Sequence, residues 1–446
     1  MYCIHTHVNI FVYAVLKYYD NGQRMKGNTM KFERTVTKSG APLFVFSMPH
    51  VENLAVGVLV NAGTRDEVWP KEAGIAHALE HMVFQGNARL FDSLSVSSEI
   101  ETIGGMLNAW TTKEMTLYYN VVPKDSLQIS ADSIGSMLNT SLFRPENIAT
   151  EMKNVVQEIK RANDSPDGFC RDMFEEVLYG QHPLGKRTLG TEESVLAFGR
   201  NDFLAFMKRL YYPKNCTFIV VGNTTLEEAE KAFDSAFPSA HGPNTKHARE
   251  HASSIVSAKK HGVFERDIKQ ANVCLGVTIG AGRDLDTEAL EFFKAMIDGG
   301  MSFPLFQEVR DKRGLCYSIG ADITPWSDCG QFQIYVGTNA ETMDEAIHCI
   351  HEVMKNSSND AHLFARAKTY LLGSTAISFT SPAAILQHAA TDIAFLGTPR
   401  SPAEIRNDIE KQTPEGVLGA VQKHLLDPAS YSYAYVVPPG TKISYT

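Results

Sequence analysis

Apolar runs and helical periodicities alternate along this chain, which indicates that strands and helices are mixed throughout it. Continuous apolar runs bounded by turn-forming residues predict strands over residues 44–49, 54–63, 108–122 and 216–223. Apolar positions at helical spacing predict helices over residues 126–138 and 202–210. We therefore expect an α+β, or mixed α/β, fold.

One further helix, predicted over residues 72–84, carries polar side chains that need an explanation. Gly86 follows it at a position suited to end a helix. His77 and His81 are i and i+4, with Glu80 at i+3, so all three project from one face. Most other positions are apolar, which indicates burial, and burying two imidazoles and a carboxylate without partners costs free energy. A bound metal ion would remove that cost.

The same pattern also has a simpler interpretation. His77 and His81 could be core histidines satisfied by hydrogen bonds, with Glu80 paired to a surface cation. The chain contains the pattern twice, and the second copy, His247 to His251, has almost no apolar flank and has the composition of a connecting segment. The pattern alone is therefore weak evidence, because zinc held by two helical histidines needs a third protein donor and an open position for water.

A second helix, predicted to begin at Pro145, offers candidates for the third donor. Its apolar positions form a stripe, and Glu151 and Glu158 lie two turns apart beside that stripe. Carboxylates beside a buried face are more often exposed partners of a salt bridge. The residues by themselves leave both interpretations open.

The pattern from His77 to His81, followed at this distance by Glu158, resembles the pitrilysin, or inverted-zincin, family of metallopeptidases. This family includes insulin-degrading enzymes and mitochondrial processing peptidase, and the half-length chains among its members are the most similar in size. Further blocks resemble family blocks in the same order, over residues 104–119, 182–195 and 299–321. The same distance counted from His251 reaches Asp328 in a turn segment, so the second copy does not fit the family pattern.

The resemblance implies a zinc site with one ion per chain, although ligand type alone would also admit cobalt or manganese in vitro. It implies that His77, His81 and Glu158 are the zinc ligands and that Glu80 is the general base, which takes a proton from water and returns it to the leaving amine. Glu151 would orient or tune this site.

The resemblance assigns roles to four residues outside the two helices. Arg310 and Tyr317 match the pair that stabilises the tetrahedral intermediate from the opposite half-shell, where a permanent cation and a hydroxyl donor suit a developing oxyanion. Asn108 and Ala109 match an edge strand on which family members bind the peptide as an added β-strand. Such main-chain pairing predicts broad specificity.

The resemblance also implies two homologous α/β domains of the pitrilysin or LuxS-like metallohydrolase type, which together form one half of a clamshell. Residues 275–284 resemble residues 56–66, as expected of duplicated halves. We predict a zinc-bearing domain over 30–240, a linker over 241–254 and a homologous domain over 255–446. If residues 288–300 correspond to the helix predicted over 72–84, then Glu291, Lys294 and Ala295 take the places of His77, Glu80 and His81. The second domain is therefore expected to bind no zinc.

Composition narrows the partners and the compartment. The chain has 446 residues, with 42 basic and 51 acidic side chains and a net charge of −9, so no basic surface indicates nucleic acid, and no segment indicates a membrane span. Seven dispersed cysteines without a CxxC pair favour a reducing compartment, the cytoplasm. Residues 1–29 are expected to be an extension that is disordered or absent from the native protein; the alternative is a weak secretory or anchor segment of a secreted or periplasmic protein.

These features predict a zinc-dependent endopeptidase acting on peptides or unfolded polypeptides in an enclosed chamber. Because this half-length chain has both the zinc residues and the Arg310/Tyr317 pair, a homodimer is the simplest expectation, with a heterodimer of related subunits as the alternative. Two other functions remain open: a maturation peptidase for a leader or presequence, and a non-catalytic scaffold subunit of the same fold.

Overall fold

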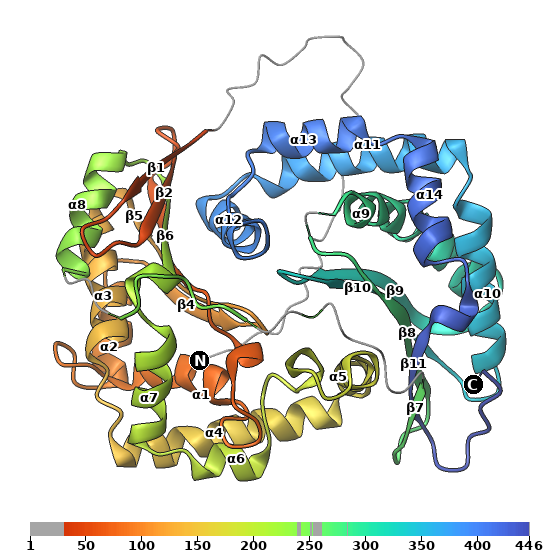
Figure 1. Ribbon diagram of the computed structural model, residues 1–446, viewed down its shortest axis with the longest axis horizontal. Helices are drawn as coiled ribbons and strands as arrows, with labels where there is room; N and C mark the ends of the chain where they lie inside the picture. The colour runs from red at the N-terminus through yellow and green to blue at the C-terminus, as the bar shows by residue number, and fades with distance from the viewer. Residues whose placement is uncertain (1–30, 239–241, 250–251, 253–260, 283, 446) are drawn as a thin grey trace.

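The computed structural model describes residues 31–238, 242–249, 252, 261–282 and 284–445. The expected extension over 1–29, and residues 241, 250–251 and 253–254 of the predicted linker, lie outside the described residues. The described chain forms two β-sheets covered by helices, which confirms the predicted mixed α/β fold (Figure 1).

The first sheet has six strands in the order β1-β2-β6-β3-β5-β4. Its strands are β1 (Phe32–Val36), β2 (Pro42–Ser47), β3 (Asn53–Val60), β4 (Met106–Thr111), β5 (Thr116–Pro123) and β6 (Cys216–Gly222). Strand β2 runs parallel to β6, and the other neighbours are antiparallel. Strand β4 therefore lies at an edge of the sheet.

The second sheet has five strands in the order β7-β11-β8-β10-β9. Its strands are β7 (His261–Glu265), β8 (Ala271–Ile279), β9 (Cys316–Pro325), β10 (Gly330–Thr338) and β11 (Ser432–Val437). Strand β7 runs parallel to β11, and the remaining pairs are antiparallel. Strand β9 therefore lies at an edge of the second sheet and forms a hairpin with β10.

Helices cover both sheets. Those before the second sheet are α1 (Ile75–Met82), α2 (Ser93–Glu101), α3 (Leu127–Thr140), α4 (Pro145–Asp164), α5 (Pro166–Tyr179), α6 (Glu192–Ala197), α7 (Arg200–Leu210) and α8 (Leu226–Ala236). Those that follow are α9 (Leu285–Ile297), a π-helix over Leu305–Lys312, α10 (Met343–Ser357), α11 (Ala361–Ser378), α12 (Pro382–Leu396), α13 (Pro402–Lys411) and α14 (Pro414–His424).

The two halves of the chain exchange helices. Helix α5 belongs to the first half by sequence, yet Cys170 and Phe174 pack in one buried cluster with Cys274 and Val436 of the second sheet. Helix α12 belongs to the second half, yet its apolar side chains, including Leu386, pack on the first sheet. Figure 1 shows α12 beside the first sheet and α5 beside the second. Each half therefore completes the core of the other, while the predicted domain boundaries stay a prediction.

Two predicted elements are wrong in their bounds. The strand predicted over 108–122 is a hairpin, because a turn at residues 112–115 separates β4 from β5, and the Thr112 hydroxyl accepts a hydrogen bond from the Met115 N–H at 3.1 Å. The helix predicted over 72–84 begins only at Ile75, because Gly74 has a left-handed φ of 85°, and it passes into a 3-10 turn at Val83. The charged strand β1 was not predicted.

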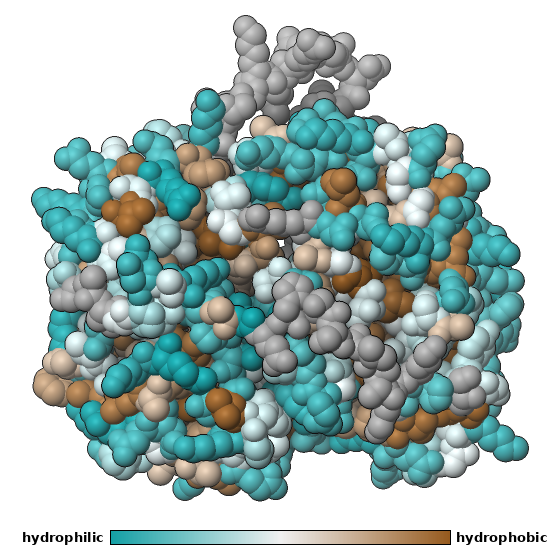
Figure 2. Space-filling view, viewed as in Figure 1, coloured by the Kyte–Doolittle hydropathy of each residue, from teal (hydrophilic) through white to brown (hydrophobic). Residues whose placement is uncertain are grey.

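The surface drawn in Figure 2 is mostly hydrophilic over both halves of the molecule. Within the described residues, no helix combines the length and the apolar character needed to cross a bilayer.

Candidate functional site

Helix α1 begins at a backbone position that only glycine suits. Besides its positive φ, Gly74 lies so close to another segment that an added Cβ would be 2.6 Å from the Leu189 carbonyl oxygen. The first N–H groups of α1 are satisfied by the Glu67 carboxylate, which accepts from Gly74 at 2.9 Å and from Ala76 at 3.0 Å. Burial raises the pKa of Glu67 well above its usual range. These contacts fix the start of the helix that carries the site.

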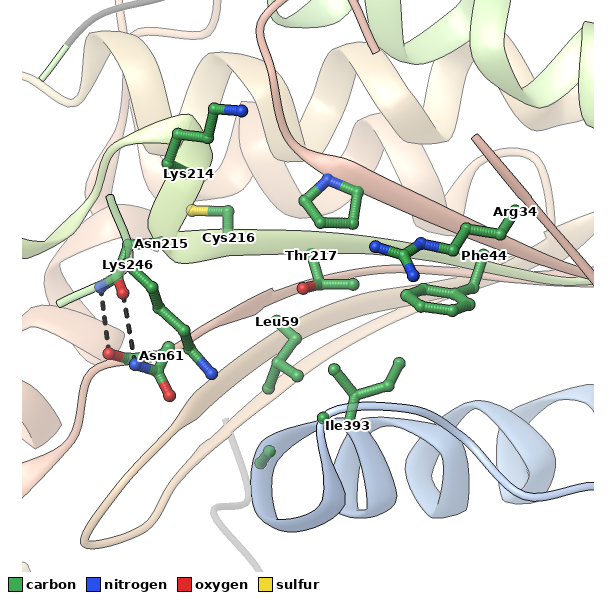
Figure 3. A pocket seen from close by; sticks show the side chains of 13 residues that line it. Arg34, Phe44, Leu59, Asn61, Lys214, Asn215, Cys216, Thr217, Lys246 and Ile393 are labelled. Carbon is green, nitrogen blue, oxygen red and sulfur yellow. Dashed lines mark hydrogen bonds between the residues drawn. The ribbon is translucent and has the colours of Figure 1, made fainter. Parts of the chain in front are cut away.

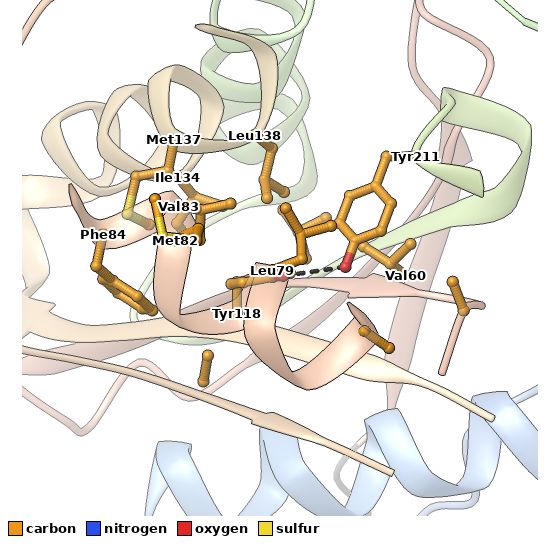
Figure 4. Close-up of a cluster of buried hydrophobic side chains, with 14 of the residues drawn as sticks. Val60, Leu79, Met82, Val83, Phe84, Tyr118, Ile134, Met137, Leu138 and Tyr211 are labelled. Atoms are coloured by element: carbon orange, nitrogen blue, oxygen red, sulfur yellow. Dashed lines mark hydrogen bonds between the residues drawn. The ribbon is translucent and has the colours of Figure 1, made fainter. Parts of the chain in front are cut away.

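The apolar side of α1 sets the rotation of the helix. Leu79 and Met82 are buried in one cluster with Ile134 and Leu138 of α3 (Figure 4). Because an α-helix places residues three or four apart on one face, this packing turns the two histidines and the glutamate of α1 away from α3. Their face meets α4.

The structure brings the three predicted ligands together between α1 and α4. Donor atoms of His77, His81 and Glu158 all lie within 4.8 Å of one another. The Glu158 Oε2 atom is 3.5 Å from His77 Nε2 and 3.6 Å from His81 Nε2. Tetrahedral zinc with bonds of about 2.0–2.1 Å requires ligand atoms about 3.3 Å apart. The two carboxylate–imidazole separations are close to this value, and two imidazoles with a carboxylate are a donor set that suits zinc.

Glu151 holds one of these histidines in place. Its Oε1 atom is 2.9 Å from His81 Nδ1, while its Oε2 atom accepts hydrogen bonds from the Gln85 amide at 3.0 Å and the Asn154 amide at 3.2 Å. With Glu151 as the acceptor, a neutral His81 donates through Nδ1 and carries its lone pair on Nε2, the atom that lies 3.6 Å from Glu158 Oε2. This is the tautomer that a metal ligand needs.

Glu80 has a partner on the neighbouring strand. The Thr111 hydroxyl, at the end of β4, donates to Glu80 Oε2 at 2.5 Å, and both side chains are buried. The predicted base is therefore held beside the histidines by a residue of the edge strand.

The predicted peptide-binding residues lie on that edge strand. Asn108 and Ala109 are in β4, which pairs only with β5 among the described strands. Asn108 is exposed, and Ala109 is buried. The free side of β4 can accept main-chain hydrogen bonds from an added strand, the arrangement used in β-augmentation.

The turn that follows β4 is anchored in the second half of the chain. The Glu114 carboxylate, which is 1% exposed, accepts from the Ser327 N–H at 2.8 Å and from its hydroxyl at 2.9 Å. Arg65 bonds to Glu114 and also to both oxygens of Asp328, at 2.8 Å each. Burial alone would lower the pKa of Arg65, but the two carboxylates outweigh burial and raise it. This buried charge network joins the two hairpin turns.

Arg310 and Tyr317 lie together in the second half of the chain. Arg310 is in the π-helix, and its guanidinium carbon is 5.5 Å from the centre of the Tyr317 ring, at the start of β9. Both residues are exposed, and the Tyr317 side chain is among the most exposed large apolar groups, at 71%. Figure 1 shows β9 in the opposite half of the molecule from α1. The structure thus pairs these residues with each other and not with the three metal-ligand candidates.

The second copy of the histidine pattern has a different setting. His247 lies 3.2 Å from Asp66, which also accepts two hydrogen bonds from Arg249 at 2.8 Å, and Glu250 and His251 lie outside the described residues. Burial acts to raise the pKa of Asp66, but hydrogen bonds from His247 and Arg249 outweigh it and lower that pKa. The described part of this copy therefore pairs with a carboxylate of the first half.

A cavity of about 130 Å³ lies on the α12 side of the first sheet (Figure 3). Its lining includes Arg34, Lys214 and Lys246, with the amides of Asn61 and Asn215. None of the predicted site residues lines it, so the cavity and the candidate site are separate features.

Sequence reasoning missed several residues that support the site. Gln85 is four residues after His81, so extending the predicted helix by one residue would have suggested it, although the structure reaches it through a 3-10 turn. Thr111 is two residues after Ala109 and faces the same side of the strand, which is a usable signal once the edge strand is known. Glu114 and Glu67 act through contacts that have no local pattern in the sequence.

Comparisons with known proteins agree with this geometry. Residues 46–192 match the family model described as Insulinase (Peptidase family M16), and residues 197–371 match the one described as Peptidase M16 inactive domain. The first match contains all three metal-ligand candidates and Glu80. The second begins after them.

Relatives and solved structures extend the likeness to most of the chain. A protein of Rickettsia bellii named as an uncharacterized zinc protease is 32% identical over 70% of this chain and 75% of its own length. One of Bacillus subtilis is 28% identical over 92% of this chain and 98% of its own. A protease structure from Helicobacter pylori has a TM-score of 0.82 at 19% identity, covering 92% of this chain and all of the other. A peptidase M16 inactive domain from Pseudomonas fluorescens, at 20% identity, has the same TM-score and covers 93% and 99%.

We predict that Glu151→Gln weakens zinc binding about 10- to 100-fold, because it removes the charged acceptor that orients His81. Competition with a fluorescent zinc chelator measures this affinity. Glu146→Gln, an exposed change on the same helix, is the matched control and should bind zinc as the native chain does. Equal affinities for all three proteins would contradict the role given to Glu151.

Proposed function

Because this chain belongs to the insulinase family of peptidases, M16, we propose that it is a zinc-dependent endopeptidase that cleaves peptides or unfolded polypeptides. The observation that supports this most strongly is the cluster of His77, His81 and Glu158, with Glu80 one position before the second histidine. Two neutral imidazoles and a carboxylate are the donor set of catalytic zinc sites, which keep one position open.

Zinc held by these three residues would supply Lewis acidity that activates water near neutral pH and polarises the scissile carbonyl. In this proposal Glu80 takes the proton of the attacking water and returns it to the leaving amine. Glu151 would keep His81 in the tautomer whose Nε2 carries the lone pair that a metal ion needs.

The free edge of β4 is the proposed binding site for the peptide main chain. A peptide paired with Asn108 and Ala109 would lie along the strand whose last residue, Thr111, contacts Glu80. Main-chain pairing makes few demands on side chains, so we propose broad specificity governed by size and unfolded state.

We further propose that two copies form a homodimer in which each zinc site is completed by Arg310 and Tyr317 of the other copy. The support is their placement: both are exposed, adjacent and in the opposite half of the chain from α1. A cation and a phenol are suitable donors to the oxyanion that develops during peptide hydrolysis. A heterodimer with a related subunit would meet the same requirement.

Cysteine usage supports the cytoplasm as the compartment of this proposed peptidase. The described cysteines, Cys170, Cys216, Cys274, Cys316, Cys329 and Cys349, are all free and buried. Free thiols in this number suit a reducing compartment.

Two alternatives are separated from this proposal by experiment. A maturation peptidase would cleave one dedicated leader or presequence and ignore an unbiased peptide mixture. A scaffold subunit, whether or not it binds zinc, would cleave neither a dedicated leader nor a peptide mixture. The match to an inactive domain does not favour the scaffold, because that match starts at residue 197, beyond the proposed ligands and base.

We predict that Glu80→Gln retains about one zinc per chain but loses turnover at least about 100-fold, because a neutral amide cannot accept the proton. The measurement combines zinc content with cleavage of a quenched, unstructured peptide. Glu101→Gln, an exposed change on α2, should behave as the native chain. If the native protein holds zinc but cleaves no peptide, the result would favour the scaffold subunit or the dedicated maturation peptidase over the proposed endopeptidase.

The dimer proposal predicts complementation between two inactive variants. Glu80→Gln lacks the base, and Arg310→Ala lacks a donor to the oxyanion, so each alone should lose at least about 100-fold in turnover. Mixing after dissociation should restore about a quarter of native turnover, because half of randomly formed dimers carry one complete site. A mixture as inactive as its components, or a fully active native monomer, would rule out shared sites.

A further inference from the structure

We propose that Thr111 is a positioning residue for Glu80, so that the strand expected to hold the peptide also sets the orientation of the base. This inference rests on the proposed peptidase function and adds a residue that acts through Glu80 without touching the reacting atoms. It assigns to β4 a second task besides main-chain pairing.

The contact between the two side chains is short and shielded from solvent. Thr111 Oγ1 lies 2.5 Å from Glu80 Oε2, and the two residues are 8% and 4% exposed. Because an ionised carboxylate can only accept, the threonine hydroxyl is the donor. Charge-assisted O–H···O⁻ bonds of this length are about twice as strong as neutral ones, and water does not compete for buried ones.

The neighbouring threonine shows that this contact is specific to Thr111. Thr116 is the direct cross-strand partner of Thr111 on β5. Its hydroxyl donates to the Ala62 carbonyl at 2.9 Å, while the two threonine hydroxyls are 3.5 Å apart. Two buried hydroxyls side by side therefore serve different acceptors, and the hydroxyl on the edge strand serves Glu80.

The backbone around Thr111 is fixed from both sides. Toward the start of β4, the strand is paired with β5 through Met106, and beyond Thr111 the turn is anchored where Glu114 accepts two hydrogen bonds from Ser327. Because the backbone on both sides of Thr111 is held by hydrogen bonds, the position of the Thr111 hydroxyl is restricted. It engages one carboxylate oxygen of Glu80 and thereby limits rotation of the group that must meet water.

A purely structural role for Thr111 makes different predictions. In that case the hydroxyl merely satisfies a buried carboxylate, and its loss would change the free energy of unfolding without a selective effect on turnover. The matched control is Thr116→Val, which removes a buried hydroxyl that donates to the Ala62 carbonyl and not to Glu80.

The test compares Thr111→Val, Thr111→Ser and Thr116→Val in the zinc-loaded, full-length protein. We expect Thr111→Val to lower kcat about 10- to 100-fold with KM within about twofold, because a misplaced base costs turnover and not binding. Thr111→Ser keeps the donor and should recover kcat to within about threefold. Zinc content and peptide affinity measured in the Glu80→Gln background should be unchanged by Thr111→Val.

A second readout does not depend on turnover. In metal-free protein, the effects of Thr111→Val and Glu80→Gln on the free energy of unfolding should be non-additive, because the two side chains share a bond. The effects of Thr116→Val and Glu80→Gln should add.

Several outcomes would overturn the inference. The kinetic outcomes against it are a native kcat in Thr111→Val, a change in KM alone, and equal kcat losses in Thr111→Val and Thr116→Val. The unfolding outcome against it is that the effects of Thr111→Val and Glu80→Gln add. Each of these results would leave the proposed peptidase function intact. If the native chain neither holds zinc nor cleaves, the proposed function fails and the inference falls with it.

Discussion

The packing of α1 against α4 is the constraint on which the candidate site depends. It places two imidazoles and three carboxylates, those of Glu80, Glu151 and Glu158, among largely apolar surroundings, where unpaired charges are costly. Glu151 offsets part of this cost by bonding to His81, while Glu158 lies within 3.6 Å of both histidines, where a bound cation would neutralise it. The apolar packing of α1 on α3 and the glycine at its start hold the helix in the rotation that this pairing needs.

The second half of the chain contributes to the site from a distance. Exchange of α5 and α12 gives each sheet a helix from the other half, and a buried network around Arg65 ties the β4–β5 turn to Asp328 in the β9–β10 turn. Separating paired charges in such a network leaves uncompensated buried groups. The geometry of the edge strand, and with it the Thr111 contact to Glu80, is thus linked to the correct association of the two halves.

Helical spacing was sufficient to put His77 and His81 on one face of their helix and Glu151 and Glu158 on one side of theirs. That the two sets meet was predicted only through the resemblance to the pitrilysin family. The prediction failed where backbone geometry decides. The β4–β5 turn, residues 112–115, has the sequence Thr-Lys-Glu-Met, without the Gly, Pro, Asn or Asp that usually marks a turn, so the pattern predicted one strand in place of two. Partners such as Glu114 and Ser327 could not be predicted, since long-range contacts leave no local periodicity.

X-ray absorption at the zinc edge of the loaded native protein would show whether His77, His81 and Glu158 form a zinc site. We expect a four-coordinate shell of nitrogen and oxygen at about 2.0–2.1 Å, with the scattering of two imidazoles, and its loss in His77→Ala. A sulfur shell at about 2.3 Å, or an unchanged spectrum in the variant, would place the metal elsewhere and contradict the assignment.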